Sequence, residues 1–274
     1  MIILRFGMNG RLATICSKAL SVVHPYASMI FANRSQVFHS QAGSHAWDDI
    51  ESLVRGFPNQ RVLLVDASVD HTSIAAMVAH EEFKRKVLKY LNSVGALDRA
   101  IGFSSGITCF DATRIRCDAI QMLEYRRQKL AQQESFSSLR CPIYLPNLFT
   151  LVGPITYSGQ GAAWAQVFKA RCEQRHGIVL NEPHTRKAWV SEFSVLRTLL
   201  NFLSTDIAVN FVGPLVCGEF TLAGIAAGDE NPIPKITYAQ GAGKGWLLDD
   251  YLPPVMPGSL QSLSDELLRA LPSL

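Results

Sequence analysis

The sequence lacks several features that would assign it to a special class of protein. No apolar run approaches the length of a membrane span, and the first one, Met1 to Phe6, is short and interrupted by Arg5. The six cysteines are spread singly, with no CxxC pair, and the seven histidines show no HExxH motif or other metal-ligand spacing. These absences predict a cytoplasmic protein with reduced thiols, no bound metal and no membrane association.

An excess of one charge is also missing. The formal net charge is only +3, and Lys and Arg are scattered through the 274 residues rather than gathered in a stripe. This balance does not imply nucleic acid. It would suit a small anionic ligand such as a phosphorylated cofactor, although composition alone favours an ordinary solvated surface. With 48% hydrophobic and 18% charged residues, the chain can bury a large core without a disulfide or a metal.

Strands alternate with helices over the first half of the sequence. Apolar runs typical of strands lie at residues 2–6, 28–32, 61–65 and 100–104. Stretches with helical periodicity lie at 11–23, 47–55, 73–92 and 113–133, and the third is expected to bury an apolar face that includes Ile74, Val78, Phe83 and Leu91. This alternation is typical of an α/β fold, a Rossmann-type doubly wound parallel sheet covered on both faces.

The second half of the sequence is less regular. An extended segment at 142–152 precedes predicted helices at 162–175, 192–203 and 262–271 and a predicted strand at 208–212. We expect residues 1–155 to form a cofactor-binding Rossmann domain to which 187–215 returns. Residues 156–186 and 216–274 would then form a smaller C-terminal substrate-binding lobe.

A glycine-rich turn follows the first strand. The run Gly7-Met8-Asn9-Gly10-Arg11-Leu12-Ala13 has G-x-x-G-x-x-[GA] spacing and leads into a predicted helix. Gly7 would allow the tight turn, Gly10 the approach of a pyrophosphate to the backbone, and Ala13 close packing of helix on strand. The helix N-terminus would then face the phosphate. We predict that Gly7, Asn9, Gly10, Arg11 and Leu12 bind a dinucleotide; the alternative is an ordinary turn.

The residues at the end of the second strand indicate which dinucleotide the chain binds. An acid at this place bonds the ribose of NAD, whereas an arginine accommodates the 2′-phosphate of NADP. The sequence has Asn33, Arg34 and Ser35 here and no acid, so we predict NADP(H). A solvated arginine is the alternative.

Tyr125 and Lys129 stand four apart on a predicted helix, so their side chains share one face. An ammonium near a phenol favours the phenolate, which makes Tyr125 a candidate proton donor or base. The spacing alone is common, and the context supports it: Ser104 and Ser105 follow a predicted parallel strand at the edge where open α/β sheets bind ligands. A serine there could bond the same substrate oxygen, or could simply form a turn.

Taken in order, these motifs resemble the extended short-chain dehydrogenase/reductase family, especially its nucleotide-sugar epimerases, reductases and dehydratases. The resemblance extends to Val65-Asp66-Ala67-Ser68, Leu145-Pro146-Asn147, Gly153-Pro154, Lys187-Ala188-Trp189-Val190 and Asn210-Phe211-Val212-Gly213. It implies that Ser105 is the catalytic hydroxyl, that Tyr125 is the acid/base, and that Lys129 binds the nicotinamide ribose and tunes the tyrosine.

The same resemblance implies further contacts. Ala67, Ser68 and Pro146 would line the cofactor, and Asn147 would lie near both nicotinamide and substrate. Arg186 or Lys187 would face a nucleotide diphosphate, although a solvated basic patch explains them almost as well. The family commonly forms homodimers through two helices that correspond here to residues 73–92 and 113–133.

Two departures from the family pattern bear on function. The gap from Ser105 to Tyr125 is short, with Cys109 and Phe110 in place of the usual tyrosine and glycine, and Gly106-Ile107 replace the Asp-Glu pair of dehydratases. Dehydration is therefore disfavoured. The leading hypothesis is NADP(H)-dependent reduction of a keto group on a nucleotide-linked sugar. The alternatives are an epimerase with tightly bound NAD(P), a reductase of a non-sugar ketone, or a non-catalytic NADP-binding regulatory protein.

Overall fold

The chain forms two compact units, each built from separate stretches of sequence. Unit 1 comprises residues 1–108, 123–147 and 196–213, and unit 2 comprises residues 109–122, 148–195 and 214–274. The computed structural model describes residues 1–7, 10–32, 37–39, 42–45, 61–69, 71–110, 120–153, 163–172, 178–180, 186–205, 209–227 and 236–238. The predicted helices at 47–55 and 262–271 lie outside these residues.

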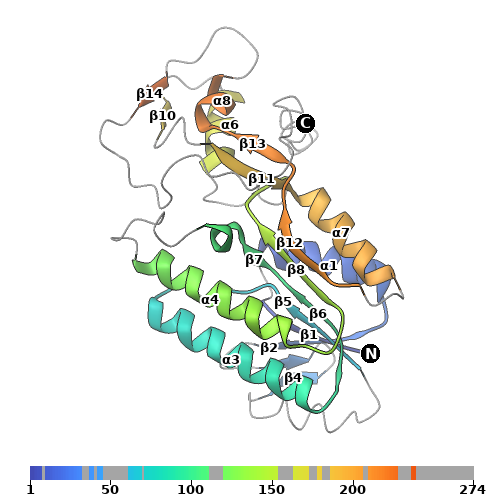
Figure 1. Ribbon diagram of the computed structural model, residues 1–274. Helices are drawn as coiled ribbons and strands as arrows, with labels where there is room; N and C mark the ends of the chain where they lie inside the picture. The colour runs from blue at the N-terminus through green and yellow to red at the C-terminus, as the bar shows by residue number, and fades with distance from the viewer. Residues whose placement is uncertain are drawn as a thin grey trace. The chain divides into compact units, whose positions relative to one another are not determined.

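A parallel sheet forms the centre of unit 1 (Figure 1). Its parallel strands are β1 (Ile2–Phe6), β2 (Ser28–Ala32), β5 (Val62–Asp66), β6 (Leu97–Gly102) and β8 (Ile143–Leu148). They lie in the order β8-β6-β5-β1-β2, so the chain starts in the middle of the sheet and extends it on both sides. This is the doubly wound arrangement that the sequence predicts, and it brings the carboxyl ends of the five strands to one edge.

Four further strands complete this sheet among the described residues. They are β3 (Val37–His39), β4 (Ala42–His45), β7 (Ser104–Ser105) and β12 (Phe211–Leu215). The β3 strand pairs antiparallel with β2, and β4 pairs antiparallel with β3. At the other edge β12 lies beside β8, and β7 also pairs with β8. The predicted strand at 100–104 is thus two strands: β6 ends at Gly102, and Ser104 belongs to β7.

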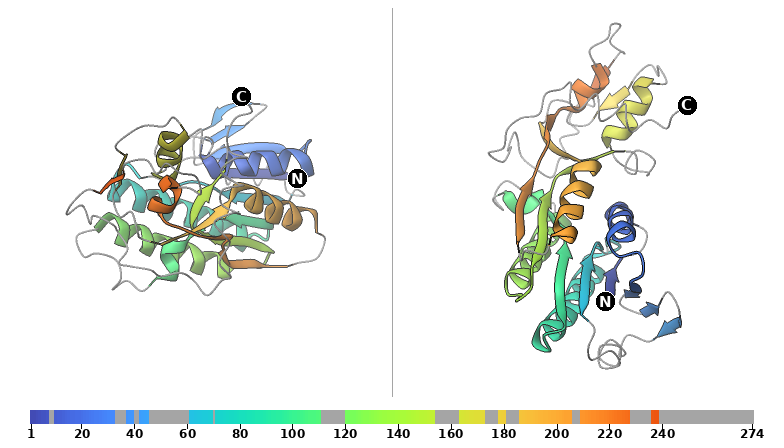
Figure 2. Two further views of the ribbon diagram at one scale, coloured as in Figure 1. Left: turned by 90° about the horizontal axis from the view of Figure 1, so that it is seen from above. Right: turned by 90° about the vertical axis from the view of Figure 1, so that its right-hand side faces the viewer.

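Helices cover both faces of this sheet. The α3 helix (Ile74–Ser93) and the α4 helix (Ile120–Ser137) lie side by side on one face, and α1 (Arg11–Val23) lies on the other (Figures 1 and 2). Alternation along β1 explains both contacts: Ile2, Leu4 and Phe6 pack in the core with α3, while Arg5 donates to the Ala13 carbonyl oxygen of α1 at 2.8 Å. The predicted fold class is therefore confirmed.

The two helices on the first face bury polar groups that the sequence pattern does not predict. In α3, Met77, Phe83, Val87, Leu88 and Leu91 are buried as their spacing suggests, whereas Ile74, expected on the apolar face, is 39% exposed. The same helix also buries His80, Glu81 and Lys84. In α4 the buried residues are Gln128, Lys129, Gln132 and Phe136. Polar groups are therefore buried beside the apolar core under these helices.

Unit 2 has smaller sheets. The strands β9 (Thr150–Val152), β11 (Lys187–Ser191) and β13 (Gly218–Phe220) form one sheet, and β10 (Ile178–Leu180) pairs with β14 (Ile236–Tyr238). Its helices are α6 (Ala163–Cys172) and α8 (Leu222–Ala227), and α7 (Glu192–Ser204) leads from unit 2 into unit 1. Trp164, Phe168, Trp189 and Phe220 form the core of this unit. None of the described helices is long and apolar enough to cross a membrane.

Candidate active site

The glycine turn after β1 packs directly on the carboxyl end of β5. Gly7 has a φ of +91°, which favours glycine, and a Cβ there would lie 2.9 Å from Ser68 Cβ and 3.0 Å from the Ala67 carbonyl oxygen. The backbone of Ala67 donates to the Phe6 carbonyl oxygen at 3.0 Å. The fold itself therefore requires glycine at position 7.

Gly10 is different. Its φ of −83° is open to any residue, and an added Cβ would meet only the Ala67 carbonyl oxygen at 3.8 Å, an ordinary contact. The fold therefore leaves room for a side chain at the start of α1. Arg11 and Leu12, both half-buried, form the first turn of that helix, which contains no acidic residue. Of the other predicted cofactor contacts, Asn9, Asn33, Arg34 and Ser35 lie outside the described residues.

Tyr125 and Lys129 lie one turn apart on α4, as predicted. The Lys129 ammonium nitrogen is 5.8 Å from the centroid of the Tyr125 ring, and this half-buried ring also contacts the His71 ring, with centroids 5.4 Å apart. The side chain of Lys129 is buried, and its Nζ donates to the Phe103 carbonyl oxygen at 2.8 Å and to Gln132 Oε1 at 3.1 Å. These bonds hold the ammonium at the carboxyl end of β6.

Gln133 joins polar groups from two strand ends. Its Nε2 lies 3.0 Å from Ser104 Oγ, 3.1 Å from Thr108 Oγ1 and 2.8 Å from Asn147 Oδ1. These contacts place Asn147, a predicted site residue, and its buried neighbour Pro146 close to Ser104, which follows β6. Sequence reasoning missed Gln133, although its position four residues after Lys129 puts it on the same helix face.

Ser105 is placed less tightly than Ser104. Its hydroxyl is half-buried and accepts a long bond of 3.4 Å from the Ile107 backbone. The hydrogen bonds of the described residues do not join Ser105 to Tyr125. Ser104, in contrast, is buried and held by Gln133. The assignment of Ser105 as the catalytic hydroxyl stays a prediction.

Ser68 pairs with a histidine that the sequence did not single out. Ser68 Oγ lies 2.9 Å from Nε2 of the buried His80, which stacks on Phe83 from the same helix. Because Ser68 also packs on Gly7, the imidazole fixes a hydroxyl beside the glycine turn. Ser68 was predicted as a cofactor contact, but its partner comes from α3 and has no signal in the local sequence.

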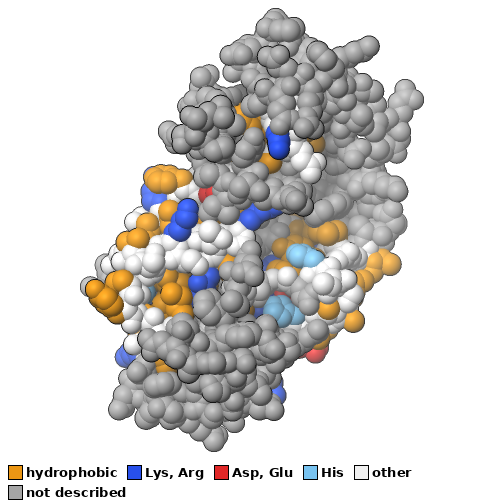
Figure 3. All heavy atoms as spheres, turned by 180° about the vertical axis from the view of Figure 1, so that it is seen from behind, with side chains coloured by type: hydrophobic (Ala, Val, Ile, Leu, Met, Phe, Trp, Pro, Cys, Tyr) orange, Lys and Arg blue, Asp and Glu red, His pale blue; other side chains and the backbone are white. Residues whose placement is uncertain are grey.

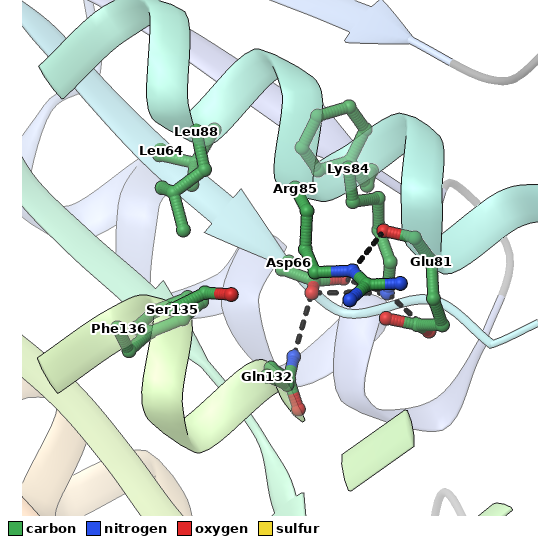
Figure 4. Close-up of a pocket in the computed structure, with 10 residues that line it drawn as sticks. Leu64, Asp66, Glu81, Lys84, Arg85, Leu88, Gln132, Ser135 and Phe136 are labelled. Atoms are coloured by element: carbon green, nitrogen blue, oxygen red, sulfur yellow. Dashed lines mark hydrogen bonds and ion pairs between the residues drawn. The ribbon is translucent and has the colours of Figure 1, made fainter. Parts of the chain in front are cut away.

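Charged side chains from β5 and α3 meet beneath this edge (Figure 4). Lys84 Nζ lies 2.9 Å and 3.0 Å from the two carboxylate oxygens of Asp66, 2.7 Å from Glu81 Oε1, and 2.9 Å from the Ser68 carbonyl oxygen. All three charged side chains are at most 5% exposed. A buried ammonium between two carboxylates needs this close pairing, because each charge alone would cost several kcal/mol to bury.

The pKa values of the two carboxyl groups in this cluster are shifted in opposite directions. Burial by itself would raise the pKa of Asp66, but the charges of Lys84 and Lys129 and hydrogen bonds from Lys84 and Gln132 hold it below its ordinary value. Burial raises the pKa of Glu81, and Asp66 adds to the increase, while Lys84 opposes it. Burial would lower the pKa of Lys84, yet the two carboxylates raise it. Asp66 is thus held as a carboxylate.

The residues predicted to bind a substrate diphosphate lie in unit 2. Arg186 pairs with Glu219 of β13, with its Nε 3.1 Å from Glu219 Oε1. Lys187, which is half-buried, begins β11. A carboxylate therefore already neutralises part of this basic stretch, and the contact of Arg186 or Lys187 with a diphosphate stays a prediction.

On the face drawn in Figure 3, Lys and Arg side chains are scattered among hydrophobic and uncharged ones and form no continuous stripe. Among the described residues, no three His, Cys, Asp or Glu side chains are placed to hold a metal ion. The polar groups at the carboxyl edge of the unit 1 sheet are therefore the candidate site.

The same fold occurs in solved structures of L-threonine 3-dehydrogenases and UDP-sugar 4-epimerases. Solved structures with the same fold include a partial-consensus L-threonine 3-dehydrogenase, with a TM-score of 0.65, 16% identity, and coverage of 98% of this chain and 99% of that chain. They also include the UDP-N-acetylglucosamine 4-epimerase of Bacillus cereus, with a TM-score of 0.60, 14% identity and 92% coverage of both chains.

A third solved structure is the UDP-glucuronic acid 4-epimerase of Bacillus cereus in complex with UDP-glucuronic acid and NAD. Its TM-score is 0.57 at 11% identity, with coverage of 100% of this chain and 95% of that chain. No family model and no curated protein matches the sequence. At these identities the likeness establishes the fold, and on this level the resemblance stated from the sequence is confirmed.

Proposed function

We propose that this chain is a nicotinamide-dependent oxidoreductase that acts on a carbonyl or hydroxyl group of a small molecule, with Tyr125 as the acid/base. One observation carries the proposal. The Lys129 ammonium is held at the carboxyl end of the parallel sheet, 5.8 Å from the Tyr125 ring and bonded to the Phe103 carbonyl oxygen. Open α/β sheets bind their ligands at this edge.

The residues at the edge fit a dinucleotide. The turn at Gly7 brings the backbone against Ala67 and Ser68, and the fold leaves room at Gly10 and at the start of α1 for a phosphate to approach. Lys129 has three N–H donors, and two of them have acceptors among the described residues, so a third can serve a ribose hydroxyl. When bound, the nicotinamide would supply or accept a hydride at the substrate carbon.

The protein's own groups would handle the proton. During reduction the Tyr125 hydroxyl gives its proton to the substrate oxygen, and during oxidation the phenolate takes it back. Ser105, or the buried Ser104, donates a hydrogen bond to the same oxygen, and Asn147, held by Gln133, borders the site.

The identity of the dinucleotide and the direction of the reaction are part of this proposal. Arg34 favours NADPH and hence net reduction of a keto group, on a nucleotide-linked sugar whose diphosphate would bind Arg186 or Lys187 of unit 2. An epimerase is an equal candidate, because the solved structures with this fold include 4-epimerases of UDP-sugars, one of them in complex with NAD. The same tyrosine and lysine would serve either reaction.

The first experiment separates these cases. Purified protein is titrated with NADPH and with NADH by fluorescence, and then incubated with UDP-sugars and with their 4-keto forms. A reductase consumes reduced cofactor with the keto sugar, whereas an epimerase interconverts UDP-sugars without net consumption.

Tyr125→Phe is the decisive variant. It should bind cofactor like the wild type and lose at least ~100-fold in turnover, the scale of a general acid/base contribution. Unchanged turnover would remove Tyr125 from the mechanism. Absence of binding to both cofactors in the wild type would overturn the proposal as a whole.

A further inference from the structure

A continuous path of buried hydrogen bonds leads away from Lys129. Its Nζ donates to Gln132 Oε1 at 3.1 Å, and Gln132 Nε2 donates to Asp66 Oδ2 at 2.6 Å. Asp66 in turn accepts from Lys84 on both oxygens, at 2.9 Å and 3.0 Å. Figure 4 shows the last part of this path, with Gln132 pointing from α4 toward Asp66 at the end of β5. The path connects three elements of unit 1.

The orientation of the Gln132 amide is fixed by its two partners. Lys129 can only donate and the Asp66 carboxylate can only accept, so the amide oxygen must face the ammonium and the amide nitrogen must face the carboxylate. A residue at position 132 therefore needs one acceptor and one donor at opposite ends. Glutamine is the uncharged side chain of this length that supplies both.

Gln132 also connects the charge of Lys129 to its counter-charge. Lys129 has only neutral oxygens as direct partners among the described residues, those of Phe103 and Gln132. Its counter-charge is Asp66, and the attraction reaches far enough that Lys129 is one of the charges that keep Asp66 ionised. Hydrogen bonds in series polarise one another, so the Asp66 carboxylate makes the Gln132 oxygen a better acceptor for the ammonium.

The other end of the path reaches the proposed cofactor edge again. Lys84, besides pairing with Asp66, donates to the Ser68 carbonyl oxygen at 2.9 Å. Ser68 is the residue that packs on Gly7. One buried network thus holds both Lys129 and the backbone beside the glycine turn.

We propose that Gln132 and Asp66 are positioning residues that orient the Lys129 ammonium toward the nicotinamide ribose and the Tyr125 hydroxyl. This inference rests on the proposed oxidoreductase function. Neither residue touches substrate or cofactor in this role. Their contribution is to hold two of the three N–H groups of Lys129, so that the third has one direction.

The first test replaces Gln132 by leucine. Gln132→Leu keeps the size of the side chain and removes both bonds, so cofactor affinity and kcat should each fall roughly 10-fold or more, the scale of a lost hydrogen bond to a charged group. The KM of the substrate should change little, because the substrate does not contact this path.

Gln128→Leu is the matched control. Gln128 is also a buried glutamine of α4, one turn before Gln132, but it bonds Glu124 instead of the network. This variant makes the same substitution in the same helix, and we expect cofactor affinity and kcat near those of the wild type. Circular dichroism and thermal unfolding report whether each variant is folded.

The second test uses the isosteric change Gln132→Glu, which preserves packing. Its carboxyl group would lie next to Asp66 and could bridge to it only while one proton is shared between them. As pH rises this proton is lost and the two carboxylates repel, so cofactor affinity should fall with rising pH, unlike in the wild type. The charged groups that face the position are Asp66 of β5, Glu81, Lys84 and Arg85 of α3, and Lys129 of α4.

The outcomes separate the two proposals. A wild type that binds and turns over, with Gln132→Leu impaired, Gln128→Leu normal and Gln132→Glu dependent on pH, supports the positioning role. If Gln132→Leu matches the wild type in both affinity and kcat, or if Gln132→Glu has the wild-type pH profile, the positioning role is wrong while the oxidoreductase function stands. If the wild type binds neither NADH nor NADPH, the function fails and the positioning role with it.

Discussion

Two parts of unit 1 reach the same edge of the sheet but are built in different ways. The glycine turn depends on backbone: Gly7 has a positive φ and packs on Ala67 and Ser68. The buried cluster depends on side chains, and its members Asp66, Lys84 and Gln132 come from β5, α3 and α4. The turn is encoded by one local stretch of sequence, whereas the cluster exists only after three distant elements have met.

This difference has energetic consequences. The turn needs a residue at position 7 that tolerates a positive φ, whereas Gly10 has room for a side chain. The cluster holds charges away from water, and each of them is tolerable only while its partners are present. Removal of a single member should therefore cost more than a change in the turn.

The largest effect is expected for Lys84→Met. This change leaves Asp66 and Glu81 side by side without their shared ammonium, and a broken buried ion pair costs about 3–5 kcal/mol. Urea unfolding followed by circular dichroism measures the loss. Lys86→Met, at an exposed position of the same helix, is the control and should stay within about 0.5 kcal/mol of the wild type. Equal stability of the two variants would show that the cluster does not stabilise the fold.

A smaller effect is expected for Gly7→Ala. The new Cβ would lie too close to Ser68 and to the Ala67 carbonyl oxygen, and alanine disfavours the positive φ at this position. Together these effects should lower the free energy of unfolding by about 1–3 kcal/mol. Gly10→Ala sharpens the comparison, because the fold has room there: we expect a stability near that of the wild type but weaker cofactor binding. Thermal unfolding and fluorescence titration measure the two properties. Normal cofactor binding by Gly10→Ala would argue against a phosphate at this turn.

The smallest effect is expected in the pH dependence of stability. The pKa of Asp66 is lowered in the folded protein, so its carboxylate stabilises the fold at pH values above its ordinary pKa of 3.8. This stabilisation is lost as pH falls through the lowered pKa. The raised pKa of Glu81 has the opposite sign: its contribution is present below 4.5 and is lost as pH rises through the raised value. Each slope is limited to about 1.4 kcal/mol per pH unit for one proton.

Two isosteric variants separate these contributions. Relative to the wild type, Asp66→Asn should have a flatter stability curve below pH 3.8, and Glu81→Gln should gain stability as pH rises above 4.5. Urea unfolding at a series of pH values measures both curves. Curves parallel to that of the wild type would mean that these carboxyl groups are not coupled to folding.

Much of the fold was predictable because it depends on local periodicity. The expected bounds of β1, α1 and β2 agree with the structure, and α3 begins one residue after Ser73, whose side chain caps it by accepting from the Ala76 backbone at 3.0 Å. The short strands β3, β4, β10, β13 and β14 were not predicted. Three- and four-residue strands carry too few alternating positions to be recognised.

The candidate site was predictable in part for the same reason. The spacing of Tyr125 and Lys129 and the turn at Gly7 are local features, and the structure places them at the same edge of the sheet. Their partners Gln132, Gln133 and His80 were missed, because polar residues on a helix are more often exposed to solvent. The predicted contacts at Asn9 and at residues 33–35 lie outside the described residues and stay predictions.

The sequence by itself determined where strands and helices alternate, where the chain must turn at Gly7, and that a tyrosine and a lysine share one helix face. Only the tertiary structure decided which polar side chains are buried and which groups they contact. The reason is physical: Lys84 and Gln132 lie 18 and 66 positions after Asp66 in the sequence, and no local pattern records contacts over such separations. Their burial becomes favourable only when β5, α3 and α4 bring opposite charges and matching hydrogen-bonding groups together.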